Sequence, residues 1–324
     1  MHRGPGTPAA GTLKIVGMIE HGHVPVLLEE VINNLDPQPG EVVVDCTLGR
    51  GGHALALGRK VGSDGLVIGI DRDAENLAYS GDRLREAQIP NMMIHDSFVS
   101  VARHLQQADR RVDVVLADLG VSSNQLNDAA RGFGFQEEGP LDMRLDQDGS
   151  DNVTSLLAQI DEGELAGLIR TYGEDPYATA IARKVVLERQ TRPITTTGQL
   201  SRLVREAYGP RARSSRLHPA TRTFMALRIA VNEEIAALET LLDLIGRGCE
   251  MTGTGGWLNP GARIGIISFH SLEDRPVKQA FADLDRRGLA TRIIRGMIRP
   301  TEAEQQANPR SRSAKFRALR ASPS

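Results

Sequence analysis

The stretch Glu41-Val-Val-Val-Asp45-Cys-Thr-Leu-Gly-Arg-Gly-Gly-His53 decides the fold of this chain of 324 residues. A β-branched run that ends in an acid and passes through a glycine-rich turn into a helical stretch is typical of a nucleotide-cofactor site. Glycine permits positive φ and lets a ligand lie against the backbone. Amides at the start of the next helix can donate to an anionic group of that ligand. The turn alone is weak evidence, so the flanking sequence has to support it.

Short apolar runs alternate with helical stretches downstream of this turn, which is the pattern of a parallel sheet in an α/β domain. The expected strands are Glu41–Asp45, Leu66–Asp71, Asn91–His95, Val112–Asp118 and Ala262–Phe269, the last preceded by a turn at Asn259–Gly261. The expected helices around them are Gly52–Lys60, Asp73–Ala87, Phe98–Gln107 and Glu273–Leu284. Two short strands near Thr291–Arg295 and Ala314–Ala321 would complete the sheet.

The segment between the fourth and fifth strands is far too long for one crossover connection and predicts an inserted helical subdomain. Asp161 and Glu164 have the spacing of a helix start, and two further helices are expected at Ala178–Arg189 and Thr197–Tyr208, the second capped by Thr197. The expected organisation is a discontinuous α/β domain at 23–135 and 217–321, an all-helical insertion at 136–216, and a disordered extension at 1–22.

The formal net charge of −2 conceals two basic segments. Residues 189–228 hold nine arginines against Glu206, and residues 286–320 hold nine arginines and Lys315 against Glu302 and Glu304, which leaves +8 in each. Such asymmetry is the electrostatic pattern of a protein that meets a polyanion on one face. The alternative is that these charges are only solvated helix faces.

Other features narrow the class of protein. No apolar run approaches the roughly 20 residues of a membrane helix. The first 22 residues are too polar for a signal peptide, which predicts a cytoplasmic protein without membrane association. Cys46 and Cys249 lie far apart in the sequence, so we expect neither a disulfide framework nor a metal site, and two small buried side chains instead.

Acids at the ends of the neighbouring expected strands sharpen the cofactor prediction. Asp71 ends the second strand, where its carboxylate could accept both hydroxyls of a ribose, a feature that dinucleotide dehydrogenases share. The D-x-T-x-G-x-G-G loop, the polar run His95–Phe98 after the third strand, and Asp118 at the end of the fourth strand favour S-adenosylmethionine over a nicotinamide cofactor. Ligands of open α/β sheets bind beyond the strand carboxyl ends, where all these residues are expected.

Ten motifs of the chain share a pattern with one known family. They are His23–Leu28, Asp45–His53, Ile70–Asp73, Asp118–Ser123, Arg131–Phe133, Gly139–Arg144, Thr171–Glu174, His218–Phe224, Ile267–Arg275 and Asn308–Lys315. With these motifs the sequence resembles the RsmH (MraW) family of small-subunit rRNA methyltransferases, and the likeness runs from His23 to Arg320. The N-terminal extension looks longer than is usual in the family, and the stretch between Leu284 and Pro300 looks shorter.

The resemblance implies a class I, Rossmann-like methyltransferase with a mostly parallel seven-stranded sheet and a helical insertion that recognises substrate. It implies S-adenosylmethionine as cofactor and methylation of the exocyclic N4 of a cytidine, conventionally position 1402, in the decoding region of 16S rRNA, within the small ribosomal subunit. A homodimer is left open. The implied cofactor contacts are Gly51, Gly52, His53, Asp71, Phe98, Asp118 and Gln125.

The cytosine amine is a weak nucleophile, so the enzyme has to position it and accept its proton. Asp118 or a nearby backbone carbonyl is the candidate acceptor. His270 is a second candidate, with a purely structural role equally open. Phe133, Phe135 or Phe269 would stack on the base. Further substrate candidates are Ser122 and Ser123, which alternatively only cap a turn, and Arg222 and Arg228.

Three alternatives remain from the sequence. A methyltransferase for a protein or a small molecule would not need the basic segments. A catalytically silent RNA-binding assembly factor would not need the glycine-rich loop with Asp71 and Asp118. An NAD-dependent oxidoreductase would bind NADH instead of S-adenosylmethionine.

Overall fold

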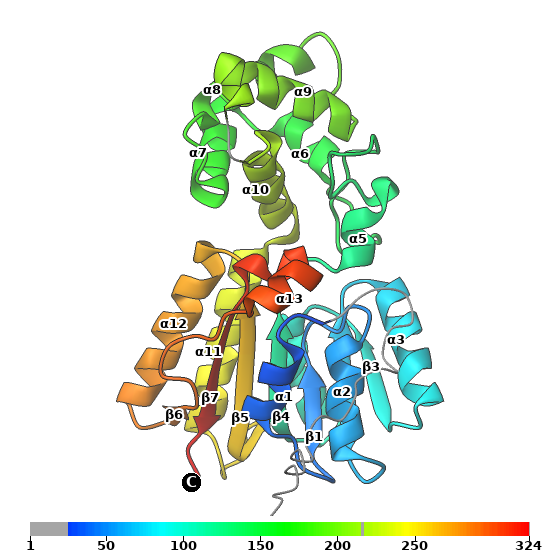
Figure 1. Ribbon diagram of the computed structural model, residues 1–324, viewed down its shortest axis with the longest axis vertical. Helices are drawn as coiled ribbons and strands as arrows, with labels where there is room; N and C mark the ends of the chain where they lie inside the picture. The colour runs from blue at the N-terminus through cyan, green and yellow to red at the C-terminus, as the bar shows by residue number, and fades with distance from the viewer. Residues whose placement is uncertain (1–24, 215–216, 324) are drawn as a thin grey trace, which may run out of the picture.

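A computed structural model describes residues 25–214 and 217–323 of the chain (Figure 1). The expected disordered extension at residues 1–22 lies outside the described residues. Within the described ranges, no helix is both long enough and apolar enough to cross a lipid bilayer.

A seven-stranded sheet forms the larger part of the molecule, in the order β3-β2-β1-β4-β5-β7-β6. The first five strands are parallel, whereas β7 runs antiparallel to both of its neighbours, β5 and β6. The strands are β1 Val42–Asp45, β2 Leu66–Asp71, β3 Asn91–His95, β4 Val112–Asp118, β5 Leu258–Ser268, β6 Ala290–Arg292 and β7 Lys315–Ala321. The order and directions confirm the expected class I, Rossmann-like fold.

Helices cover both faces of this sheet (Figure 1). Apolar side chains of α1 Leu28–Leu35, α2 Gly52–Val61 and α3 Ala74–Glu86 form one hydrophobic cluster with one face. Side chains of α4 Val101–Gln107, α11 Glu234–Glu250 and α12 Ser271–Arg286 form a second cluster on the other face. Successive strand residues point to opposite faces, so Val43 joins the first cluster and Val44 the second.

The insertion between β4 and β5 stands above the sheet as a separate helical layer (Figure 1). It begins with α5 Ser123–Asn127, after which the chain forms α6 to α10. These helices are α6 Val153–Gln159, α7 Glu162–Gly173, α8 Ala178–Arg189, α9 Thr197–Tyr208 and α10 Ala220–Asn232. Asp161 and Glu164 start α7 with the expected capping box, in which each side chain accepts from the backbone amide of the other residue.

The insertion has its own hydrophobic core, which extends from Phe133 to Leu227 and includes Phe224. Both Phe224 and Leu227 belong to α10, so this core continues past the boundary expected at residue 216. The reason is that the buried side chains of α10 pack against α7 and α9 of the insertion. The chain then enters α11 at Glu233, a non-glycine residue in the left-handed conformation (φ 53°).

Two local predictions are wrong. The fifth strand begins at Leu258 instead of Ala262, and the Asn259–Gly261 segment lies inside it as an irregularity in register against β4 instead of preceding it as a turn. The cap of α9 is Thr196, whose hydroxyl accepts from the Gln199 amide. Thr197 is already helical and uses its hydroxyl to hold the Gly139 segment instead.

The last two helical segments lie against the upper edge of the sheet. They are α13 Glu302–Ala307 and the 3₁₀ helix η4 Pro309–Ser313. Figure 1 shows α13 between the sheet domain and the helical insertion, close to α5. The part of the chain that the structure describes has three other 3₁₀ segments, at Phe98–Ser100 (η1), Ala129–Arg131 (η2) and Gly209–Arg213 (η3).

Candidate active site

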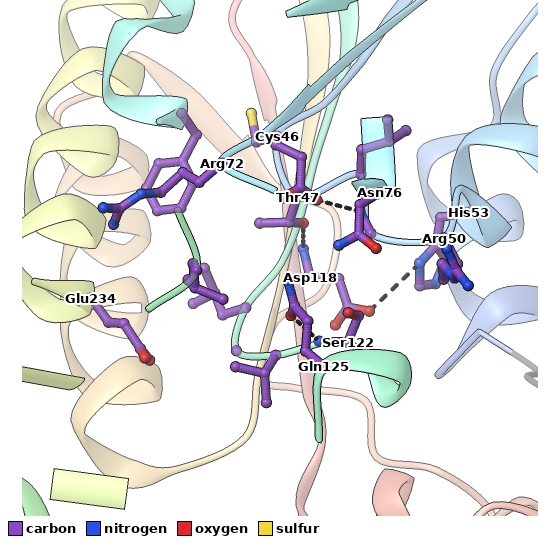
Figure 2. A pocket seen from close by; sticks show the side chains of 18 of the residues that line it. Cys46, Thr47, Arg50, His53, Arg72, Asn76, Asp118, Ser122, Gln125 and Glu234 are labelled. Atoms are coloured by element: carbon purple, nitrogen blue, oxygen red, sulfur yellow. Dashed lines mark hydrogen bonds and ion pairs between the residues drawn. The ribbon is translucent and has the colours of Figure 1, made fainter. Parts of the chain in front are cut away.

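A pocket lies beyond the carboxyl ends of β1, β2 and β4, where the order of the crossovers reverses between β1 and β4 (Figure 2). This is the usual ligand position in an open α/β sheet. The glycine-rich loop that follows β1 lines it on one side, and residues that follow β3, β4 and β5 line the others. The first two turns of α11 close it with Glu234 and Leu238.

Two strand-end acids use their carboxylates to hold the loop backbone. Asp71 accepts from the Gly49 amide through one oxygen, at 2.7 Å, and from the Asp73 amide through the other, at 2.8 Å. Asp45 accepts from the Thr47 amide at 3.1 Å. The glycine-rich turn is therefore tied to β1 and β2, and each oxygen of Asp71 keeps a lone pair for a further donor.

Asp118 is the third strand-end acid and faces the cavity beside His53 (Figure 2). Its Oδ2 lies 3.7 Å from Nδ1 of His53, and its backbone amide donates to the Thr47 hydroxyl. The other ring nitrogen of His53, Nε2, is 2.9 Å from the Val26 carbonyl. Since a carbonyl only accepts, Nε2 carries the hydrogen, and a neutral His53 then presents the lone pair of Nδ1 to Asp118.

These acids are hard to ionise where they stand. Burial raises the pKa of Asp45 to about 7, and the charge of Asp71 adds to this effect. Burial also raises the pKa of Asp71 to about 6, against the amides of Asp73 and Gly49. Burial, followed by the charges of Asp45 and Glu273, raises the pKa of Asp118 well above its usual range. Asp118 Oδ1 is enclosed without a hydrogen-bond partner among the described residues.

Two glycines of the loop are required by close packing. Gly51 precedes α2 with φ 69°, a conformation that favours glycine, and a Cβ there would lie 2.9 Å from the Ser80 side chain. A Cβ on Gly52 would lie 2.4 Å from Cγ of Pro25. Gly52 faces the pocket, whereas Gly51 is outside its lining.

A buried polar network joins the pocket to the root of the insertion. Asp73 caps α3 and forms a 2.7 Å ion pair with Arg131, both side chains being almost fully buried. Gln125 donates to the same carboxylate oxygen at 2.8 Å, and its own carbonyl accepts from the Ser122 amide. Arg131 also donates to the carbonyls of Arg144 and Leu145. Gln125 therefore lines the pocket with both polar groups of its amide already bonded.

The wall after β5 contains a second buried network. Glu273 accepts from the Phe269 amide, and its Oε1 lies 3.1 Å from Nε2 of His270. Burial raises the pKa of Glu273, but His270, the Phe269 amide and Arg228 outweigh it and leave the pKa below its usual range. Arg228 is bonded through two nitrogens to Glu234, both at 2.8 Å.

The predicted residues thus fall into two groups. Those brought to the pocket are Gly52, His53, Asp71, Phe98, Asp118, Ser122, Ser123, Gln125 and Phe269. Those outside its lining are Gly51, Phe133, Phe135, Arg222, Arg228 and His270. Ser122 caps α5, and its hydroxyl donates to the Asn124 side chain.

The residues outside the lining are occupied by other contacts. Phe133 is buried in the core of the insertion, and Phe135 stacks on His218 with ring centroids 4.5 Å apart. Arg222 donates to the Glu174 carbonyl, whereas Arg228 is held in its ion pair. Of the three aromatic candidates for stacking on a base, Phe269 is therefore the one in place.

Several lining residues were not predicted from the sequence. Thr47 lies within the D-x-T-x-G loop and holds the Asp118 amide, a role that its spacing alone does not reveal. Glu273 and Arg310 were part of recognisable motifs, and both line the pocket. Glu234 carried no local signal, because its place depends on how α10 passes into α11.

Almost the whole chain matches one known protein family. The model of the MraW methylase family matches residues 20–322. The chain belongs to the MraW methylase family. The family predicted from the motifs is thereby confirmed, and the chain is a methyltransferase.

Individual relatives are similar to this MraW family member along most of their length. Ribosomal RNA small subunit methyltransferase H of Symbiobacterium thermophilum is 42% identical over 316 residues, which cover 92% of this chain and 96% of that protein. The protein of the same name from Synechococcus elongatus is 44% identical over 296 residues, which cover 91% and 93%. A solved rRNA methylase from Streptococcus thermophilus superposes with a TM-score of 0.41 at 13% identity over 93% of this chain and 99% of its own.

Proposed function

We propose that this methyltransferase uses S-adenosylmethionine to methylate N4 of a cytidine in the decoding region of 16S rRNA. The observation that carries the cofactor assignment is the set of buried acids at the ends of β1, β2 and β4. The names of the relatives, ribosomal RNA small subunit methyltransferase H, support the choice of substrate.

The residues of the pocket fit a cationic cofactor. Asp45, Asp71 and Asp118 stand together, with pKa values raised by burial and by the charges of neighbouring acids. A positive charge in the pocket favours their ionised forms, whereas the pyrophosphate of a dinucleotide would add to the repulsion. The enclosed Oδ1 of Asp118 supports the same conclusion, because a buried polar atom of this kind calls for a ligand that bonds to it or carries positive charge.

We assign the cofactor-binding roles accordingly. Asp71 would bind the ribose hydroxyls with the lone pairs left by its two backbone bonds. Phe98 lines the pocket after β3 and would pack on the adenine. Gly52 and His53 would contact the cofactor at the start of α2, with Gly51 shaping the turn from behind. When bound, S-adenosylmethionine supplies an electrophilic methyl group.

Asp118 is the candidate proton acceptor in this proposal. It stands at the end of β4, and its pKa falls when positive charge approaches, so that it ionises when the pocket is filled. The carboxylate can then accept a hydrogen bond from the N4 amine and take its proton as the new bond forms. His53, fixed by the Val26 carbonyl, faces Asp118 and can share that proton.

Phe269 and His270 divide the roles that the sequence left open at the end of β5. Phe269 lines the cavity and would stack on the cytosine. His270 stands behind it, against Glu273, and would position this wall without touching the substrate.

Two measurements test the proposal. Calorimetry should detect binding of S-adenosylmethionine and none of NADH. Small subunits from cells that lack the gene should gain N4-methylcytidine when incubated with the enzyme and S-adenosylmethionine, as detected by mass spectrometry of rRNA digests. Cofactor binding without methyl transfer would indicate a silent assembly factor, and transfer to protein alone would assign another substrate.

A further inference from the structure

The Asn308–Lys315 motif has no part in the chemistry described above, yet the structure brings it to the mouth of the pocket. Asn308 and Arg310 are among the residues that line the cavity. They lie where α13 passes into η4, beside α5 and above the carboxyl ends of the strands (Figure 1). The motif therefore reaches the pocket in which methyl transfer is proposed.

This segment is firmly attached on both sides. Glu304 of α13 accepts from the Leu27 amide at 2.8 Å. Leu27 follows Val26, whose carbonyl is hydrogen-bonded to His53. Ser311 of η4 is fully buried. Arg310 donates to the side-chain oxygen of Asn127, the last residue of α5, at 2.6 Å. The guanidinium of Arg310 is thus held over the pocket, with its remaining N–H groups free to donate.

The charges of the two arginines in this segment are not neutralised. Arg310 is exposed and bonded to a neutral amide, and Arg312 is exposed and forms no ion pair with any described residue. Two arginines of the insertion differ from them: Arg202 pairs with two glutamates, and Arg228 is buried in an ion pair. Arg310 lines the pocket, and Arg312 follows it two residues later in η4. Exposed guanidinium groups without an acidic partner are suited to phosphate oxygens.

We propose that Arg310 and Arg312 bind backbone phosphates of the RNA strand that delivers the target base to the pocket. A base drawn out of a strand into a pocket leaves its flanking phosphates at the rim, where contacts fix the register of the strand. The inference rests on the proposed function, and it moves the expected phosphate contacts from Arg222 and Arg228 to the C-terminal motif.

The test compares Arg310→Gln and Arg312→Gln with the matched control Arg320→Gln. Arg320 belongs to the same basic segment, is exposed and forms no ion pair with the described residues. It pairs with Arg263 in the β5–β7 ladder, whereas Lys315 pairs with Ser268, so Arg320 lies toward the opposite end of the sheet from the pocket. Melting temperatures of all three variants show whether each one folds.

The readouts are KM for small subunits from cells that lack the gene, its dependence on salt, and the Kd of S-adenosylmethionine. Each of Arg310→Gln and Arg312→Gln should raise KM about tenfold, because a hydrogen bond between charged groups is lost. Each should also reduce the slope of log KM against log salt by about 0.7 to 0.9, the loss of one phosphate contact. The Kd of S-adenosylmethionine should not change, and Arg320→Gln should match the wild type.

The outcomes separate this proposal from the one on which it rests. If the wild-type enzyme methylates RNA and the three variants share its KM and salt slope, the phosphate assignment is overturned and the proposed function stands. If Arg310→Gln instead weakens S-adenosylmethionine binding with KM for RNA unchanged, Arg310 belongs to the cofactor site and the assignment is also overturned. A wild-type enzyme without methyl transfer to RNA overturns both proposals.

Discussion

Replacing Arg131 by glutamine should destabilise the protein more than any exposed charge change. The Arg131–Asp73 ion pair is 2.7 Å long, with side chains only 5% and 3% exposed. Glutamine would leave the Asp73 carboxylate buried without its cation and would free the carbonyls of Arg144 and Leu145. Removing one partner of a buried pair costs about 3–5 kcal/mol, because the other charge stays desolvated.

The matched control is Arg202→Gln, which breaks two exposed ion pairs with Glu188 and Glu206. Exposed pairs contribute about 0.2–1 kcal/mol, so the two variants should differ several-fold in their effect on the free energy of unfolding. Urea denaturation at neutral pH, monitored by circular dichroism, measures the free energy of unfolding of both variants. An Arg131→Gln variant no less stable than Arg202→Gln would refute the claim that this network holds the insertion to the sheet domain.

The pH dependence gives this prediction a second test. Burial alone would raise the pKa of Asp73, but the hydrogen bonds from Gln125 and Arg131 and the charge of Arg131 outweigh it and lower the pKa. A depressed pKa contributes stability that is fully present above the unfolded pKa of about 3.9 and is lost as the pH falls through the folded value. The loss of unfolding free energy caused by Arg131→Gln should therefore be smaller at acid pH than at neutral pH. Because the Asp73 amide also donates to Asp71, the variant should bind S-adenosylmethionine more weakly.

Three further predictions concern the pocket. Gly52→Ala should cost about 1–3 kcal/mol of stability and weaken the binding of S-adenosylmethionine measured by calorimetry, because its Cβ would lie 2.4 Å from Pro25. Unchanged binding would contradict the packing argument. The affinity for S-adenosylmethionine should rise from pH 5.5 to 8, as Asp45 and Asp71, with pKa values of about 7 and about 6, ionise; a flat profile would refute the cationic-site argument. Asp118→Asn should lower kcat by about 10²–10⁴ while the protein stays folded, and a wild-type rate would exclude Asp118 as proton acceptor.

The sequence predicted the sheet and the strand-end acids because both depend on local pattern. Short β-branched runs that stop at Asp45, Asp71 and Asp118 place those acids at one edge of any parallel sheet. The predicted start of β5 was wrong for the same reason. Asn259–Gly261 has the composition of a turn, but the residues on both sides of it pair with β4. A local sequence pattern does not reveal a shift of register within a strand.

Side-chain partners were the part that the sequence could not supply. Arg222 and Arg228 looked alike as basic residues, but one donates to a carbonyl and the other is buried against Glu234. Which arginine stays exposed depends on packing between elements distant in sequence. The same holds for Arg310, whose place at the pocket follows from its contact with Asn127, 183 residues away in the chain.

The most direct test of the central claim is transfer of an isotopically labelled methyl group. Small subunits from cells lacking the gene are incubated with the enzyme and labelled S-adenosylmethionine, and the rRNA is then digested and analysed by mass spectrometry. We expect the label in a single nucleoside, N4-methylcytidine, within an oligonucleotide of the decoding region, and its loss with Asp118→Asn. Label in another nucleoside or in protein, or no label at all, would contradict the proposed function.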